Sequence, residues 1–135
     1  MVSLATKAAA YLLNQHDRKD QLLIERGIDY WTSPDGAFVP VPPRVSNADI
    51  MRELIDPQSL TEEEDEAFRV DPNTFAISRG WTRVRLYPSQ QIGYVDFGAG
   101  RQRTHTRSVL DLLDQLQLSS IRLRFTDEQG NYISP

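Results

Sequence analysis

The stretch WTRVRLYPSQQIGYVDF, residues 81–97, decides the fold of this chain. Apolar and polar side chains alternate along residues 81–87. The alternation ends at Pro88 and Ser89 and resumes along residues 92–97. A period of two is typical of strands that bury one face, and the interruption indicates a turn. The sequence therefore predicts an antiparallel hairpin.

The segments around this hairpin predict an α+β fold. Residues after it indicate a helix with buried leucines around residues 109–116 and then a strand over residues 118–126. One helix packed across these strands gives a two-layer ββαβ sandwich with an antiparallel sheet. Before the hairpin we expect a helical N-terminal part, with helices over residues 3–15 and 18–26 and a small hairpin over residues 28–41. Thr61 and Glu64 form a capping-box pattern at the start of a further helix.

Length and charge bound the organisation of the chain. Its 135 residues favour a single domain, residues 1–135, with an acidic helix and hairpin part at 1–60 and a helix plus ββαβ sandwich at 61–135. Residues 1–70 hold 7 basic and 13 acidic side chains, whereas residues 71–135 hold 8 basic and 6 acidic ones. The missing cysteines exclude disulfides and thiol chemistry. No apolar run reaches the roughly 20 residues of a membrane span, and we expect a cytoplasmic protein without membrane partners.

The strand register predicts one face for binding. If Thr82, Val84 and Leu86 point toward the helix, the alternate residues share the opposite face. That face would carry the arginine and aromatic side chains Trp81, Arg83, Arg85, Tyr87, Tyr94, Arg122 and Arg124. Both residue types are enriched in binding hot spots, so the leading hypothesis is a non-enzymatic protein-binding protein. This hypothesis predicts that Arg83→Glu with Arg85→Glu abolishes partner capture and leaves the thermal midpoint nearly unchanged.

Two other interpretations of this face stay open. Arginine and aromatic side chains on a sheet can stack the bases of single-stranded nucleic acid. Alternatively, the acidic N-terminal helices cover the face and pair with its arginines, in which case it has a structural role only.

The glycine-rich stretch after the hairpin is a second candidate site. Residues 98–106 would form a loop before a helix, with Arg101, Arg103, His105 and Arg107 placed to hold a phosphate or another anion. This stretch lacks both the third glycine of a dinucleotide fingerprint and the Lys-Ser/Thr of a P-loop. Asp96 could orient His105, but one such pair does not define a reaction. We therefore expect no catalytic residues, no metal and no cofactor.

A short motif adds a resemblance. The segment RGWTRVR, residues 79–85, followed by a second strand and an amphipathic helix, resembles a part of small uncharacterised proteins from bacteriophages and mobile elements. The resemblance covers residues 64–125. It implies a phage- or prophage-encoded viral protein that engages a host or virion component in the host cytoplasm, and it identifies no active-site residues.

Overall fold

A computed structural model describes residues 4–17, 27–42, 44–97, 102–118, 120–127 and 131–133. The predicted helix at residues 18–26 lies outside these ranges. The described helices are α1 (Leu4–Asp17), α3 (Asn47–Leu54), α4 (Glu62–Val70), α5 (Pro72–Ser78) and α6 (Gln102–Gln115). The described strands are β1 (Ile28–Thr32), β2 (Phe38–Pro40), β3 (Thr82–Tyr87), β4 (Ile92–Asp96), β5 (Arg122–Thr126) and β6 (Tyr132–Ile133).

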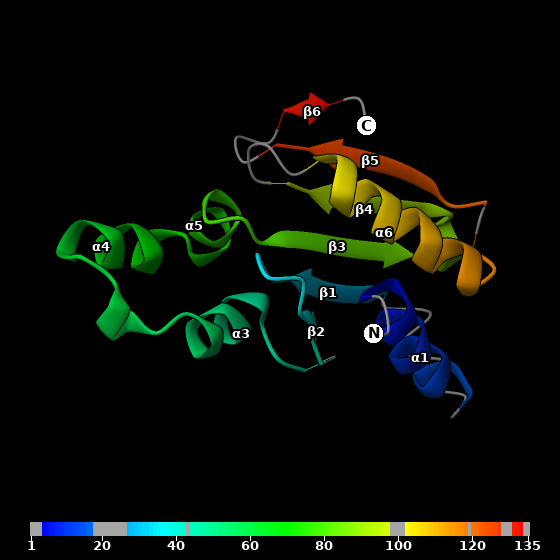
Figure 1. Cartoon of the computed structure of the whole chain (residues 1–135), viewed down its shortest axis with the longest axis horizontal. Helices are drawn as coiled ribbons and strands as arrows, with labels where there is room; N and C mark the ends of the chain where they lie inside the picture. Colours follow the sequence, from blue (N-terminus) through cyan, green and yellow to red (C-terminus); the bar gives the residue numbers. More distant parts are fainter. Residues whose placement is uncertain are drawn as a thin grey trace.

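The strands form one sheet in the order β2-β1-β3-β4-β5-β6 (Figure 1). This arrangement confirms the α+β class, with β3, β4, α6 and β5 in the predicted ββαβ order. Neighbouring strands are antiparallel except β4 and β5, which are parallel, so the sheet is mixed rather than antiparallel throughout. The physical reason is α6, because a helix that crosses over a sheet returns the chain in its starting direction.

The hairpin of β3 and β4 has the predicted register. Val84 lies opposite Val95, and a short 3-10 helix over Pro88–Gln90 makes the turn. The side chains of Thr82, Val84 and Leu86 are fully buried, whereas the residues between them are half-buried. The alternation in the sequence therefore reports the two faces of the sheet correctly. We call the face that carries Val84 the first face and the one that carries Arg85 the second face.

Helices α1 and α6 cover the first face. Ala8, Ala9 and Leu12 of α1 join Val109 and Leu112 of α6 in one apolar core with the buried strand residues. The sequence predicted that α6 alone would cover this face. The small side chains of α1 let a second helix pack beside it, and each helix gains stability by burying its apolar stripe.

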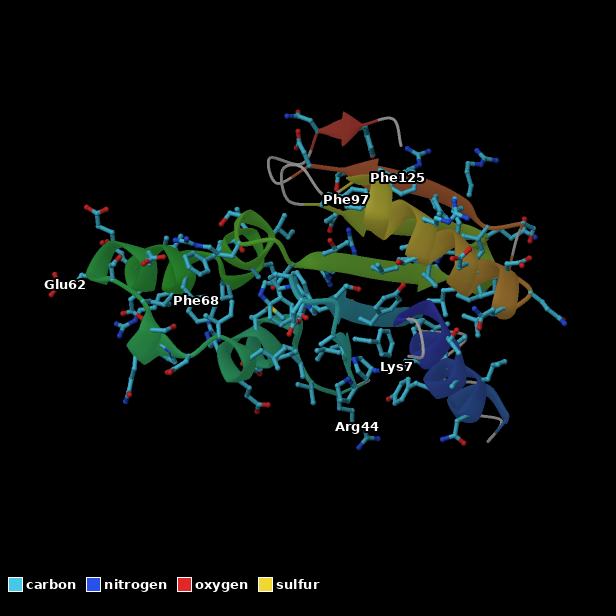
Figure 2. All side chains as sticks on the ribbon, in the orientation of Figure 1. Lys7, Arg44, Glu62, Phe68, Phe97 and Phe125 are labelled. Atoms are coloured by element: carbon cyan, nitrogen blue, oxygen red, sulfur yellow. The ribbon has the colours of Figure 1, made fainter. Side chains whose placement is uncertain are left out.

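Helices α3, α4 and α5 form an arm at one end of the sheet, on the left in Figure 1. The arm has its own core, which consists of Trp31, Met51, Phe68, Phe75, Ala76 and Ile77. The label of Phe68 in Figure 2 marks the position of this core. The predicted capping box is present, since Thr61 and Glu64 exchange side-chain to backbone hydrogen bonds at the start of α4. Trp31 comes from β1, so this core joins the arm to the sheet.

The sheet also joins the two parts of the chain that the sequence distinguished. Strands β1 and β2 belong to residues 1–60, and β1 pairs along its whole length with β3. The predicted small hairpin is therefore an extension of the central sheet. Because β1 lies between β2 and β3, side chains of the N-terminal part stand directly beside the arginines of β3.

Candidate functional site

Cross-strand rows of side chains make up the second face. One row runs Asp29, Arg85, Tyr94 and Arg124 across β1, β3, β4 and β5, because each residue lies opposite the next. A second row runs Trp31, Arg83, Asp96 and Thr126 in the same way. A third contains Tyr87, Ile92 and Arg122. The structure thus brings together every predicted partner-binding residue except Trp81.

Trp81 belongs to the arm rather than to the open face. It precedes β3 and packs against the arm core, with its ring 6.4 Å from that of Trp31 in an edge-to-face arrangement. Trp31 itself is fully buried and donates a hydrogen bond from Nε1 to Oδ1 of Asn47. The arm therefore closes the end of the second face where these tryptophans lie.

Arg83 and Arg85 are engaged within the sheet. Nη2 of Arg83 lies 3.1 Å from Oδ2 of Asp29, and Nη2 of Arg85 lies 3.4 Å from Oδ2 of Asp96. All four side chains are shielded, with exposed fractions of 20% and 28% in the first pair and 29% and 15% in the second. Both arginines thus have carboxylate partners inside the fold, but these partners come from β1 and β4, whereas the N-terminal helix α1 packs on the first face and does not cover them.

Asp96 has a different environment from the one the sequence suggested. Its carboxylate accepts hydrogen bonds from Arg85 and from the hydroxyl of Thr126, on the second face. Helix α6, which carries His105, packs on the first face through Val109 and Leu112. The carboxylate of Asp96 therefore faces away from the side of the sheet on which α6 packs, and the side chain of His105 lies outside what the structure describes.

Arginine and tyrosine side chains alternate on the remaining part of the second face. The guanidinium of Arg85 lies over the ring of Tyr94 at 5.0 Å, and that of Arg124 lies over the ring of Tyr132 at 5.6 Å. The rings of Tyr87 and Tyr94 contact edge to face at 6.0 Å. Unlike Arg83 and Arg85, the side chains of Arg122 and Arg124 are exposed. Sequence reasoning missed Tyr132, which lies opposite Thr126 and is 68% exposed.

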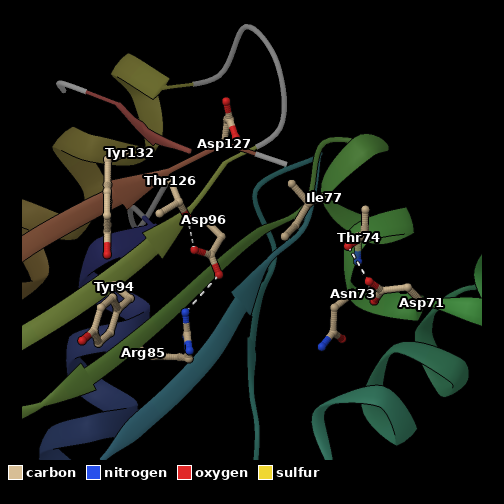
Figure 3. A pocket seen from close by; sticks show the side chains of 10 residues that line it. All are labelled: Asp71, Asn73, Thr74, Ile77, Arg85, Tyr94, Asp96, Thr126, Asp127 and Tyr132. Atoms are coloured by element: carbon tan, nitrogen blue, oxygen red, sulfur yellow. Dashed lines mark hydrogen bonds and ion pairs between the residues drawn. The ribbon is translucent and has the colours of Figure 1, made fainter. Parts of the chain in front are cut away.

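A cavity of about 520 Å³ lies between this part of the second face and α5. Figure 3 shows α5 on one side and the strand residues on the other. The lining residues are Asp71, Asn73, Thr74 and Ile77 from the α5 side and Arg85, Tyr94, Asp96, Thr126, Asp127 and Tyr132 from the sheet side. Its volume is within the range of small-molecule and side-chain binding sites.

The loop predicted for the anion-binding stretch is shorter than expected, because part of this stretch belongs to helix α6. Helix α6 begins at Gln102, so Arg103 and His105 are part of the helix. The helix starts earlier than the threonines at 104 and 106 suggested. Arg107 is exposed on α6. Arg101 and the side chains of Arg103 and His105 lie outside what the structure describes.

Neither a metal-binding cluster nor a membrane-spanning helix occurs among the described residues. Within the described ranges, no group of three or more histidine and carboxylate side chains is placed to hold a metal ion. In the same ranges, no helix combines the length and the apolar character needed to cross a bilayer. The polar groups on the second face are instead suited to hydrogen bonding and ion pairing.

Comparison of the chain with protein-family models, with curated proteins and with solved structures finds no match to any of them.

Proposed function

We propose that the chain is a non-enzymatic protein-binding protein that uses the open part of the second face. We define this open part as Tyr87, Tyr94, Arg122, Arg124 and Tyr132. The observation that supports the proposal is the contrast between two sets of arginines. Arg83 and Arg85 have carboxylate partners inside the fold, whereas Arg122 and Arg124 are exposed, with Arg124 over the ring of Tyr132.

This combination has the chemistry of a protein interface. Tyrosine supplies a large contact area at low cost in side-chain entropy, and arginine supplies directional donors. Because β4 and β5 hold these side chains in register, a partner would meet an ordered surface. This would reduce the entropy lost on binding. A phage or prophage origin and a cytoplasmic site of action remain part of the proposal, and they agree with capture of a host or virion protein.

The test is capture of partners from an extract of the native host, followed by mass spectrometry. Arg122→Glu with Arg124→Glu should abolish the capture of a specific protein, because both side chains are exposed on the open part. Arg44→Glu with Arg69→Glu is the matched control, since it changes the same charge at exposed positions away from β5. Equal loss in both double variants, or capture that survives in the first, would contradict the proposal.

Single-stranded nucleic-acid binding is the second candidate. The exposed Arg122 and Arg124 on a face with tyrosine rings favour it. The carboxylates Asp29 and Asp96 and the net charge of −4 weaken attraction to phosphates. Fluorescence anisotropy with a labelled oligonucleotide at low salt distinguishes the two candidates. Binding that falls steeply with salt would favour the nucleic acid, and no binding at low salt would exclude it.

The anion-binding hypothesis for Arg101, Arg103, His105 and Arg107 requires its own test. A phosphate-ligand binder or enzyme should be stabilised against heat by at least one nucleotide or sugar phosphate. No shift of the thermal midpoint across such a panel would argue against this hypothesis.

A further inference from the structure

The cavity between α5 and the second face combines carboxylates on two walls with tyrosine rings. Asp71 comes from the α5 side, whereas Asp96 and Asp127 come from the sheet side. Arg85 is the basic side chain among the described lining residues, and it contacts both Asp96 and the ring of Tyr94. The lining thus keeps a net negative charge after Arg85 has offset one carboxylate.

An unsatisfied acceptor adds a second observation. Oδ1 of Asn73 is buried and has no hydrogen-bond partner in the part of the chain that the structure describes. Asn73 also lines the cavity, next to Asp71. A buried amide oxygen without a partner costs stability, and an N–H donor that reached this oxygen would recover part of that cost.

We propose that the cavity binds the guanidinium group of an arginine side chain presented by the protein partner. This inference rests on the proposed function and adds the chemistry of the partner. A guanidinium is planar and carries five N–H donors in a geometry that matches a carboxylate. It is also more weakly hydrated than an ammonium and stacks on aromatic rings, so it is favoured over lysine in a partly enclosed site.

The positions of the tyrosines agree with this ligand. Tyr132 is mostly exposed at one side of the cavity, and Tyr94 lies along its sheet wall (Figure 3). Arg124 and Arg85 already lie over these two rings, which shows that the local geometry accepts guanidinium groups beside tyrosine. The volume of about 520 Å³ exceeds that of one side chain, which leaves room for part of the main chain that carries it.

The test is an NMR titration of the whole chain with N-acetyl-arginine amide. The lysine and glutamate analogues serve as matched probes. Arginine should shift the resonances of Asn73, Tyr94 and Tyr132, lysine should bind more weakly, and glutamate should cause no shift there. Because this readout uses the unmodified chain, it does not depend on whether a variant folds.

Variants sharpen the assignment. Asp71→Asn keeps a side chain that can cap α5 and removes one charge, and Tyr132→Ala removes the exposed ring. Each should weaken arginine binding by about threefold to fivefold. Asp111→Asn, at an exposed position on α6, should leave binding unchanged.

The outcomes separate this inference from the proposed function. No arginine-induced shift at the cavity would overturn the site, and lysine binding as tight as arginine would overturn the choice of guanidinium. Either result leaves the proposed function intact if the Arg122 and Arg124 double variant still loses capture. Failure of that capture experiment would instead remove the function on which the inference rests.

Discussion

The local environments of Asp29 and Asp71 shift the pKa values of their carboxyl groups in opposite directions. Burial raises the pKa of Asp29 above its ordinary value, and the nearby Arg83 guanidinium opposes this shift only in part. Oδ1 of Asp29 has no hydrogen-bond partner among the described residues, so only Oδ2 of this carboxylate is paired. Asp71 accepts hydrogen bonds from the hydroxyl and backbone N–H of Thr74, and these hold the pKa of Asp71 below its ordinary value.

Carboxyl-carbon NMR during a pH titration tests these directions. We expect the pKa of Asp29 to lie above, and that of Asp71 below, the ordinary aspartate value of about 3.9. Asp71 then contributes stability above the unfolded-state pKa and loses it as the pH falls through its lower folded-state pKa. Asp29 acts in the opposite sense, since its contribution is present below the unfolded-state pKa and is lost as the pH rises through its higher folded-state pKa. A pKa of Asp29 at or below the ordinary value, or a pKa of Asp71 at or above it, would contradict the corresponding assignment.

The partners of the arginines are the residue-level features that the sequence did not reveal. Arg83 pairs with Asp29, which lies on a strand 54 residues earlier in the sequence. Arg85 meets Asp96 diagonally across the hairpin. Neither pair has a local spacing signature, because cross-strand contacts depend on which strands become neighbours. Composition showed only that the N-terminal half could supply the acidic side chains.

At the scale of elements, Gly27 fixes how the chain enters β1. Its φ is +99°, and a Cβ there would lie 2.9 Å from the carbonyl oxygen of Leu86 and 2.8 Å from the ring of Tyr87. Gly36 has a similar φ of +92° in the turn between β1 and β2, but a Cβ there would meet nothing within 4 Å. A Cβ at Gly36 would therefore introduce backbone strain only, whereas a Cβ at Gly27 would introduce both backbone strain and a steric clash.

Urea denaturation of two alanine variants tests this difference. Gly36→Ala should lower the free energy of unfolding by about 1 kcal/mol through backbone strain alone. Gly27→Ala should cost about 1–3 kcal/mol more, because the backbone oxygen of Leu86 cannot move without disturbing β3. Equal losses in the two variants would show that the entry to β1 is more open than described.

Elements were predicted well where their signals are local. Alternation gave both faces of β3 and β4, and the Thr61–Glu64 pattern gave the start of α4. The parallel pairing of β4 with β5 and the position of β1 beside β3 were not predicted, because they depend on long-range contacts. The early start of α6 was also missed, since its first turn is polar.

At the scale of the whole molecule, two cores meet along β1 and β3. One core lies under α1 and α6, and the other lies in the arm around Trp31 and Phe68. The cavity lies where the arm meets the second face, so its lining comes from three separate stretches of the chain, residues 71–77, 85–96 and 126–132. No pattern within any one stretch indicates that the others stand opposite, which is why the sequence predicted the face but not the cavity.

The central claim is that the inner arginines hold the sheet together while the outer ones face a partner. It reverses the sequence-based expectation that charge reversal at Arg83 and Arg85 leaves stability unchanged. In Arg83→Glu with Arg85→Glu, the shielded carboxylates of Asp29 and Asp96 lose their partners and gain like charges beside them. Loss of one partner from a buried ion pair typically lowers the free energy of unfolding by about 3–5 kcal/mol. The side chains here are partly exposed, so we expect a smaller loss, of at least about 2 kcal/mol.

Denaturant unfolding of the two double variants side by side tests this claim most directly. Arg83→Glu with Arg85→Glu should lower the free energy of unfolding by at least about 2 kcal/mol. Arg122→Glu with Arg124→Glu, which carries the same charge change at exposed positions, should stay within about 0.5 kcal/mol of the parent chain. An unchanged stability in the inner variant, or an equal loss in both, would contradict the account.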